Sequence, residues 1–212
     1  MSEYVSIRVI FIPSGSLRDV AIGLAKEISE AGKTYFIVDD KKYYSHLTVY
    51  KTEFPEHSVN DVYSVVGQLA KDIKQLNLRF KRFYCDWGWV GFDFHKSKEI
   101  FTAHKKIVKS LNVLREGHIS EKYLKEMEVT SKYSERQRKY IKNFGYPQVM
   151  VEYHPHLTLA RFEDEDVGNK VSTKYNRLKI AIPDSKVSEI ALAESGDHGT
   201  VTGILKRYKL VK

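Results

Sequence analysis

Two stretches of this chain repeat one arrangement of a tyrosine, a histidine, a threonine and a basic residue. Residues 43–51 read YYSHLTVYK and residues 153–161 read YHPHLTLAR, and the two align without gaps. Side chains two positions apart lie on the same face of a β-strand, so each stretch, if extended, presents an imidazole and a hydroxyl together. Two such strands facing one another across a cleft would place four side chains around one tetrahedral anion: His46, Thr48, His156 and Thr158.

This set of side chains is suited to the cleavage of a phosphodiester. The reaction needs a base that deprotonates water or a ribose hydroxyl and an acid that protonates the departing oxygen, and imidazole titrates close enough to neutral pH to do either. Two histidines therefore suffice without a metal or another cofactor. The threonines would donate to the non-bridging oxygens, and Arg161 and Lys51 are candidate cations for binding the substrate. Both follow their histidine by five positions. In an ideal strand this is the opposite face, so they need a bulge, a strand end or a long reach.

The composition favours a phosphate-bearing partner. In 212 residues, Lys and Arg outnumber Asp and Glu by 35 to 27, so at neutral pH the protein attracts polyanions such as RNA. Aromatic residues make up 12% of the chain, as core or as flat surfaces for nucleobases. Cys85 is the only cysteine, which excludes an intrachain disulfide and a thiolate metal cluster. The sequence has neither a secretory leader nor a long apolar run, so we expect a cytoplasmic monomer without a membrane partner.

Hydrophobic periodicity predicts the order of the elements. Apolar residues recur at spacings of three and four in four segments, which predicts helices over residues 17–31, 59–76, 99–114 and 166–178. Runs rich in β-branched and aromatic residues predict strands over residues 6–13, 44–50 and 149–162 and two strands each within 78–94 and 186–211, the last pair joined by a turn at 196–199.

These elements predict an α+β fold in a single bilobal domain over residues 1–212. The second part of the chain repeats the strand, helix and strand elements of the first, so we expect two pseudo-symmetric lobes whose antiparallel sheets line a central cleft, with helices packed outside. Residues 115–148 differ, with eight Lys or Arg and five Glu. We interpret them as a charged, partly helical insertion on the surface, which either binds an RNA backbone or is simply solvated.

The duplicated stretch resembles the signature of the 2H phosphoesterase superfamily, and in particular its LigT-like branch, the 2'-5' RNA ligase family of RNA 2',3'-cyclic phosphodiesterases. That signature is a pair of H-x-[ST]-x motifs, which this chain meets with HLTV at residues 46–49 and HLTL at 156–159. The resemblance implies a fold of two lobes around a cleft, catalytic roles for both His-Thr pairs, and no metal. It also implies that Arg161 lies near the phosphate.

The sequence therefore predicts a hydrolase that opens 2',3'-cyclic phosphate ends of RNA or related nucleotides to phosphomonoesters. Which histidine is the acid and which the base is open, as is the oxygen that keeps the phosphate. One alternative is a small nucleotide substrate, such as a cyclic ADP-ribose phosphate or a 2'-5' oligoadenylate. Another is an RNA-binding module without turnover. Tyr44 and Tyr153, next to the motifs, are candidates for stacking on a base. For His154 we expect a structural or supporting role, and for the remaining histidines a surface position: His57, His95, His104, His118 and His198.

Overall fold

The computed structural model describes residues 3–129 and 132–212 and contains two antiparallel sheets. The first sheet has strand order β3-β1-β8-β4, and β9 also pairs with β8. Its strands are β1 (Tyr4–Pro13), β3 (Leu47–Pro55), β4 (Leu76–Leu78), β8 (Ser185–Ser195) and β9 (Val201–Lys209).

The second sheet has strand order β2-β7-β6-β5. Its strands are β2 (Thr34–Ile37), β5 (Phe80–Asp86), β6 (Trp89–Phe94) and β7 (His156–Phe162). The first motif thus lies at the start of β3 in one sheet and the second motif on β7 in the other. These two strands also contact each other.

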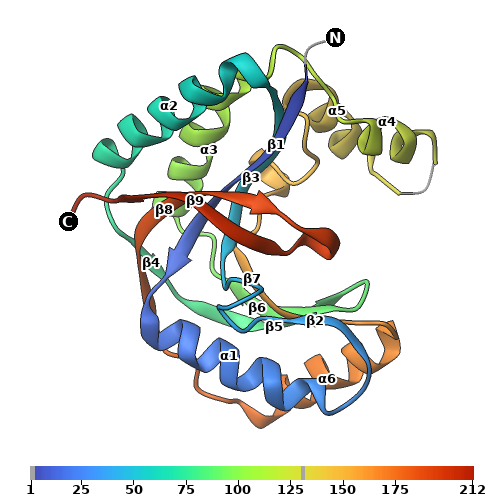
Figure 1. Ribbon diagram of the computed structural model, residues 1–212. Helices are drawn as coiled ribbons and strands as arrows, with labels where there is room; N and C mark the ends of the chain where they lie inside the picture. The colour runs from blue at the N-terminus through green and yellow to red at the C-terminus, as the bar shows by residue number, and fades with distance from the viewer. Residues whose placement is uncertain (1–2, 130–131) are drawn as a thin grey trace.

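Four helices cover the outer faces of the sheets (Figure 1). Helices α2 (Val59–Asp72) and α3 (Lys98–Asn112) pack on the first sheet, and α1 (Gly15–Ser29) and α6 (Glu165–Leu178) pack on the second. Each turns an apolar stripe inward, as the periodicity predicted, because burying that stripe is what stabilises an amphipathic helix. The α+β class and the arrangement of two sheets with helices outside are therefore confirmed.

The two sheets do not correspond to the two halves of the chain. Strand β2 comes from the first half and joins the second sheet, while β8 and β9 at the end of the chain complete the first sheet. The sequence had suggested a repeat of the same elements in each part. The pairing differs because β8 lies between β1 and β9 and forms long antiparallel ladders with both.

Both motif strands begin later than the sequence predicted. Residues 41–45 form a loop rather than a strand, because Asp39 Oδ1 accepts the backbone N–H groups of three following residues and Asp40 accepts that of Ser45. The predicted strand at 149–162 starts only at His156, since a turn of 3₁₀ helix occupies Met150–Glu152. The histidine of each motif thus lies at the entrance of its strand.

The segment 115–148 contains helices α4 (Glu121–Glu128) and α5 (Glu135–Phe144). It is helical in pieces, as predicted, but it is more than a solvated surface. Arg115 is 2% exposed and donates to the carbonyls of Lys142 and Asn143, which ties the two ends of the segment together. The hydroxyl of Tyr50 on β3 donates to the carbonyl of Phe144 and attaches the segment to the first sheet. In Figure 1, α4 and α5 stand beside the end of the sheets, apart from the four outer helices.

Within the described ranges, no helix combines the length and the apolar character that crossing a bilayer requires.

Candidate active site

Both motif strands carry a β-bulge at the same place. In the β1–β3 ladder Val9 pairs with Tyr50 and Ile10 with Thr48, so Val49 is an extra residue. In the β6–β7 ladder Val90 pairs with Ala160 and Gly91 with Thr158, so Leu159 is an extra residue. A bulge places two residues of one strand opposite one of its neighbour and so reverses the alternation of side chains beyond it.

This reversal brings the basic residue of each motif to the face of its threonine. Lys51 and Arg161 both line the same cleft as Thr48 and Thr158. Of the three alternatives that the sequence left for these two cations, a bulge, a strand end or a long reach, both strands contain the bulge. Beyond the bulges, Lys51 pairs with Arg8 across the β1–β3 ladder. Arg161 pairs with Trp89 across the β6–β7 ladder.

Gly91 permits the bulge in β7. A Cβ atom at this position would lie 2.1 Å from the carbonyl oxygen of Leu157 and 2.8 Å from the Cα of Thr158. These distances are far below van der Waals contact, so only glycine allows the backbone of β6 to approach the second motif so closely.

The cleft between the sheets has a volume of about 690 Å³. The first sheet contributes Arg8, Thr48 and Lys51, and the second contributes Tyr84, His156, Thr158 and Arg161. The insertion closes one side with Lys122, Tyr123, Glu126, Lys132, Tyr133, Gln137 and Tyr146, and the β8–β9 turn lies at another side. Of the four motif side chains, three line the cleft directly, whereas His46 contacts it through Arg8.

Each motif histidine is anchored by its Nδ1 atom to the backbone two residues earlier. His46 Nδ1 donates to the carbonyl of Tyr44 at 2.7 Å, and His156 Nδ1 donates to the carbonyl of His154 at 3.1 Å. A carbonyl only accepts, so in both rings the proton of the neutral form is on Nδ1. The Nε2 atom of each ring is left as the one that can accept or deliver a proton.

Arg8 connects the first motif to the β8–β9 turn. Its guanidinium is 3% exposed, and Nη1 donates to His46 Nε2 at 3.1 Å, to Thr48 Oγ1 at 3.4 Å and to the carbonyl of Gly199. One Nη1 atom has two hydrogens and cannot satisfy three acceptors fully. Its Nε is also buried without a partner among the described residues. Arg8 is therefore a buried cation whose hydrogen-bonding capacity within the protein is not matched.

The environment favours the neutral form of both motif histidines. Burial and the charge of Arg8 lower the pKa of His46 to about 3. Burial and the neighbouring His154 lower the pKa of His156 to about 4, although Asp93 acts in the opposite direction. A positive charge in a buried site is costly unless an anion compensates it, so a bound phosphate would raise both pKa values.

The second threonine is supported by a buried tyrosine. The hydroxyl of Tyr84 lies 2.8 Å from Thr158 Oγ1, and the edge of its ring faces His156 at 5.4 Å between ring centroids. Burial raises the pKa of Tyr84 above its ordinary value, so the phenol keeps its proton. Asp93, 7% exposed, pairs with His156 across the β6–β7 ladder.

Arg161 is held between flat side chains. Its guanidinium lies 3.9 Å from the ring centroid of Trp89 and 4.8 Å from that of Tyr35, and its Nη1 donates to His198 Nδ1. The ring of His198 stacks on Tyr35 at 4.3 Å, and the indole of Trp89 donates to the carbonyl of His198 at 2.9 Å. The predicted turn at 196–199 is therefore exposed but fastened to the second sheet through the arginine.

Two candidates for base stacking are placed elsewhere than the sequence suggested. Tyr153 is 2% exposed and stacks on the ring of His104 at 3.9 Å, so it is a core residue and cannot contact a base. Tyr44 is half-buried against the small apolar cluster around Ile10, and it serves the site through its backbone carbonyl. Both tyrosines have apolar neighbours that bury their rings, which a sequence pattern does not reveal.

The other histidines divide between the site, the surface and the core. His154 lines the cleft, and its ring lies 4.6 Å from that of His156, in agreement with the supporting role expected for it. The surface position expected for His104 is wrong. This side chain on α3 is fully buried against β3 and the turn at Met150–Glu152. Both of its ring nitrogens have backbone partners there, the carbonyl of Val49 and the N–H of Met150.

Sequence reasoning missed three residues of the site, namely Arg8, Tyr84 and Asp93. For two of them a signal exists in the chain. Arg8 is the single charged residue in the apolar run SIRVIFIP, and Asp93 is the single charged residue in VGFDF. A charge in a strand that is otherwise buried requires a partner or a ligand, which makes it a candidate functional residue. Tyr84 has no comparable signal.

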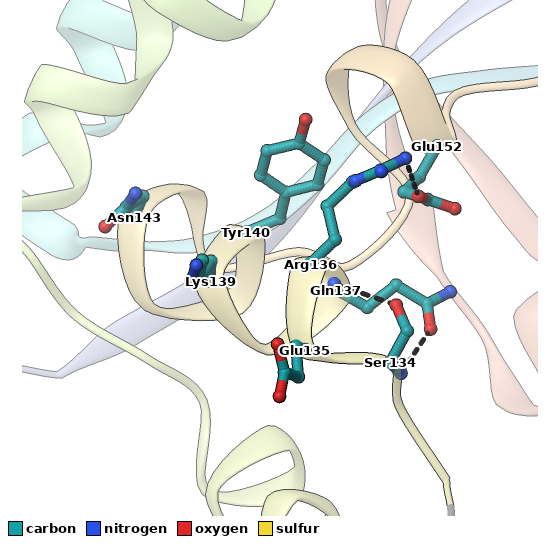
Figure 2. Close-up of a pocket in the computed structure, with 8 residues that line it drawn as sticks. All are labelled: Ser134, Glu135, Arg136, Gln137, Lys139, Tyr140, Asn143 and Glu152. Atoms are coloured by element: carbon teal, nitrogen blue, oxygen red, sulfur yellow. Dashed lines mark hydrogen bonds and ion pairs between the residues drawn. The ribbon is translucent and has the colours of Figure 1, made fainter.

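A second hollow, of about 860 Å³, lies along α5 and shares Gln137 with the cleft (Figure 2). Its lining is polar, and Arg136 is paired with Glu152 at 3.3 Å. The side chain of Gln137 accepts from the backbone of Ser134 and closes a capping box at the start of the helix. These contacts explain the residues as parts of a helix surface, and the hollow contains none of the motif residues. In the described part of the chain, no group of three or more His, Cys, Asp or Glu side chains is arranged to hold a metal ion.

The fold is shared with solved structures over the whole chain. "Crystal structure of E.coli LigT complexed with phosphate" is 15% identical and has a TM-score of 0.54, with all of both chains covered. The crystal structure of TT0787 from Thermus thermophilus is 13% identical and has a TM-score of 0.58, with 97% of this chain and 98% of that chain covered. At such identities the likeness concerns the fold alone, and the expected LigT-like fold is confirmed.

In sequence, no curated protein matches the chain. A protein family does match, over residues 56–200, a range that includes the second motif and the insertion. This range is more than half of the chain, and the LigT fold extends over its whole length. The chain therefore belongs to the family described as "Protein of unknown function (DUF1045)".

Proposed function

We propose that this protein is a metal-independent phosphodiesterase that hydrolyses 2',3'-cyclic phosphate ends of RNA or related nucleotides to phosphomonoesters. The observation that carries the proposal is the matched anchoring of two histidines at one cleft. Each Nδ1 is bound to a backbone carbonyl, which leaves Nε2 as the proton-transferring atom, and the Nε2 of His46 accepts from Arg8. Two imidazoles with defined tautomers provide the base and the acid that opening a cyclic phosphate needs.

The surroundings of the two rings support different roles for them. The guanidinium of Arg8 donates to His46 Nε2, which favours the unprotonated ring, so we assign the base to His46. Asp93 lies across from His156 and opposes the lowering of its pKa, which it does not do for His46, so we assign the acid to His156. His46 removes a proton from water as the water oxygen bonds to phosphorus. His156 then gives its proton to the ribose oxygen as the bond between that oxygen and phosphorus breaks.

The remaining groups of the cleft stabilise the charge that develops on the phosphate. Thr48 and Thr158 can donate to the two non-bridging oxygens, and Tyr84 keeps the hydroxyl of Thr158 in place. Arg8 shares Nη1 among three acceptors and does not satisfy them all, so a phosphate can replace one of these acceptors. Structures of LigT are described as complexed with phosphate and with 3'-AMP. Such complexes support a phosphate or nucleotide ligand for the shared fold.

The test is hydrolysis of adenosine 2',3'-cyclic phosphate and of an RNA with a cyclic phosphate end, followed by phosphorus NMR in the presence of EDTA. We expect a bell-shaped dependence of kcat/KM on pH and near-complete loss of turnover in His46→Ala and His156→Ala. His95→Ala, which changes an exposed histidine, is the matched control. Circular dichroism verifies the fold of each variant. Retained turnover in either motif variant would exclude the mechanism.

The size of the cleft favours a second candidate substrate, a small nucleotide such as a cyclic ADP-ribose phosphate or a 2'-5' oligoadenylate. A volume of about 690 Å³, closed on one side by the insertion, is typical of sites that enclose a small molecule. Comparing kcat/KM for these compounds and for cyclic-ended RNA of increasing length separates the two substrates. A binding module would be indicated instead if the unmodified protein and the His46→Ala variant both bind RNA and neither forms product.

A further inference from the structure

We infer that the cleft contains a second anion subsite, formed by Lys51 and Lys122 beside the insertion, which binds a phosphate group of the substrate other than the one that reacts. The inference rests on the proposed function and specifies its substrate class. The preferred nucleotide carries a second phosphate, separated from the cyclic one by the ribose.

The position of Lys51 is the first argument. The bulge at Val49 turns its side chain into the cleft, directly across the ladder from Arg8. In the described part of the chain, its ammonium group has no hydrogen bond or ion pair. The two carboxylates that act on it electrostatically are already engaged. Glu53 accepts from His118 at 2.7 Å, and Glu126 accepts from Lys132 and Tyr133.

The insertion supplies the other side of the subsite. Lys122, at the start of α4, lines the cleft and acts electrostatically on Lys51. Tyr123 follows it and is 9% exposed, and both Tyr123 and Tyr146 line the cleft. The hydroxyl of Tyr146 donates to the side chain of Gln148 at 3.1 Å. Lysine ammonium groups and phenols are donors, and together they suit the several acceptor oxygens of a phosphate.

The electrostatics of the unliganded site support the same conclusion. Burial lowers the pKa of Lys51 to about 7, and the charges of Arg8 and Lys122 act in the same direction. Like charges that face one another across a sheet destabilise the fold, so this arrangement costs free energy unless an anion compensates it. In the proposed mechanism, the His-Thr pairs bind the reacting phosphate. A second anionic group would neutralise the cations at the insertion.

Two kinds of substrate offer a second phosphate. In a mononucleotide it is a phosphomonoester on the 5' oxygen, with two negative charges at neutral pH. In an RNA end it is the phosphodiester that joins the last two nucleotides, with one charge. The shared chemistry is a phosphate group separated from the reacting one by a ribose, and the substrates below distinguish its two forms.

The experiment compares kcat/KM for three compounds: adenosine 2',3'-cyclic phosphate, the same compound with a 5'-phosphate, and the dinucleotide ApA with a 2',3'-cyclic phosphate end. We expect the unmodified protein to prefer one or both compounds with a second phosphate by about tenfold or more. The form that is preferred identifies the source. In Lys51→Met and in Lys122→Met, the ratio of kcat/KM for the compounds with and without a second phosphate should decrease about tenfold and approach one. Lys125→Met on the same helix, which removes an exposed lysine paired with Glu121, should keep it.

The overturning results are an equal kcat/KM for all three compounds in the unmodified protein, or an equal loss for all three in both lysine variants. Calorimetric binding of adenosine 3',5'-bisphosphate and adenosine 3'-monophosphate tests the subsite without turnover. One outcome separates the two proposals. If no compound is hydrolysed, but the bisphosphate binds more tightly than the monophosphate and this difference is lost in Lys51→Met or Lys122→Met, the phosphodiesterase proposal fails and the subsite stands. If the two ligands bind alike, the subsite is disproved. Because Lys122 is exposed, its variant remains informative if the Lys51 variant does not fold.

Discussion

Arg8 and Lys51 face each other across the β1–β3 ladder, so two cations leave neighbouring strands on the same side of the sheet. In an antiparallel pair, side chains of directly opposed residues are close, and like charges there oppose folding. No carboxylate of the described residues forms an ion pair with either of them. The protein therefore keeps an electrostatically unfavourable pair at the site where an anion would bind.

Removing one of these charges should stabilise the unliganded protein. Lys51→Met keeps most of the aliphatic stem and removes the ammonium group, so we expect the free energy of unfolding to rise by up to about 1 kcal/mol. For a chain of this size, such a change corresponds to about 2–4 °C in Tm. Thermal unfolding with and without inorganic phosphate is the measurement, and phosphate should stabilise the variant less than the unmodified protein.

The stabilisation by Lys51→Met should depend on pH, and the pKa of Lys51 determines the direction of this dependence. The pKa is about 7 in the folded protein, against about 10.4 for an unfolded lysine. Between these values the unfolded chain binds the extra proton, so the stability of the unmodified protein rises with pH from 7 to 10. The stability of Lys51→Met should lack this rise with pH. The amount by which its free energy of unfolding exceeds that of the unmodified protein should therefore shrink towards pH 10. Lys125→Met is the control. An advantage that is the same at pH 7 and 9 would contradict the assignment.

Tyr84→Phe should lower kcat more than it changes KM. The hydroxyl that it removes lies 2.8 Å from Thr158 Oγ1, and its loss leaves the threonine free to rotate away from the phosphate. The loss of one such hydrogen bond corresponds to about a fivefold decrease in kcat. Steady-state kinetics with a cyclic nucleotide measure it.

Tyr153→Phe is the matched control for this prediction. The hydroxyl of Tyr153 is buried and has no partner among the described residues, so its removal should leave kcat unchanged and the stability equal or higher. If both variants lose activity to the same extent, the effect of Tyr84 is one of packing and not of its hydrogen bond to Thr158.

The sequence predicts most of the local structure and the centre of the site, because both depend on short-range patterns. Helices with apolar stripes, such as α2 and α3, follow from spacing alone. The His-Thr pairs follow from a duplicated stretch in which an imidazole and a hydroxyl share one strand face. Strand parity also shows that Lys51 and Arg161 need a bulge, a strand end or a long reach, and the ladders contain a bulge in both places.

The residues around this centre depend on pairing between distant segments, which no local pattern specifies. Arg8 reaches His46 because β1 pairs with β3, and it reaches Gly199 because β8 pairs with β1. Tyr84 on β5 and Thr158 on β7 are separated by β6. The tyrosine ring reaches the threonine across Gly91, where there is no side chain in the way. The depth at which Tyr153 is buried likewise depends on α3, which lies in a separate segment of the chain.

His104 on α3 connects the backbone of the two motif regions by hydrogen bonds. Its Nδ1 donates to the carbonyl of Val49, the bulge residue of β3, and its Nε2 accepts the N–H of Met150 in the turn before β7. Met150 has a positive φ of 52°, a conformation that residues other than glycine rarely adopt without support. The ring is therefore a bridge that fixes the backbone at both motifs, and it serves in this way only while it is neutral.

Protonation of His104 should break this bridge and make the protein sensitive to acid. Burial lowers the pKa of His104 to about 3, against about 6.5 in the unfolded chain. Between these values the unfolded state binds the extra proton, so the free energy of unfolding falls as the pH decreases from 6.5 towards 3. The slope from this one residue is at most about 1.4 kcal/mol per pH unit. His46 and His156, whose pKa values are also lowered, add to the slope in the same direction.

His104→Gln isolates the share of this residue. At pH 7 the variant should lose about 1–3 kcal/mol of stability, because two buried backbone groups lose their partner or keep a poorer one. The difference in the free energy of unfolding between the variant and the unmodified protein should narrow as the pH falls from 6.5 to 4, since the variant has no imidazole to protonate at this position. Urea denaturation at several pH values measures the gap, and His57→Gln, which changes an exposed histidine, should run parallel to the unmodified protein. A gap that stays constant over this range would mean that the charge state of His104 does not control the bridge between the motifs.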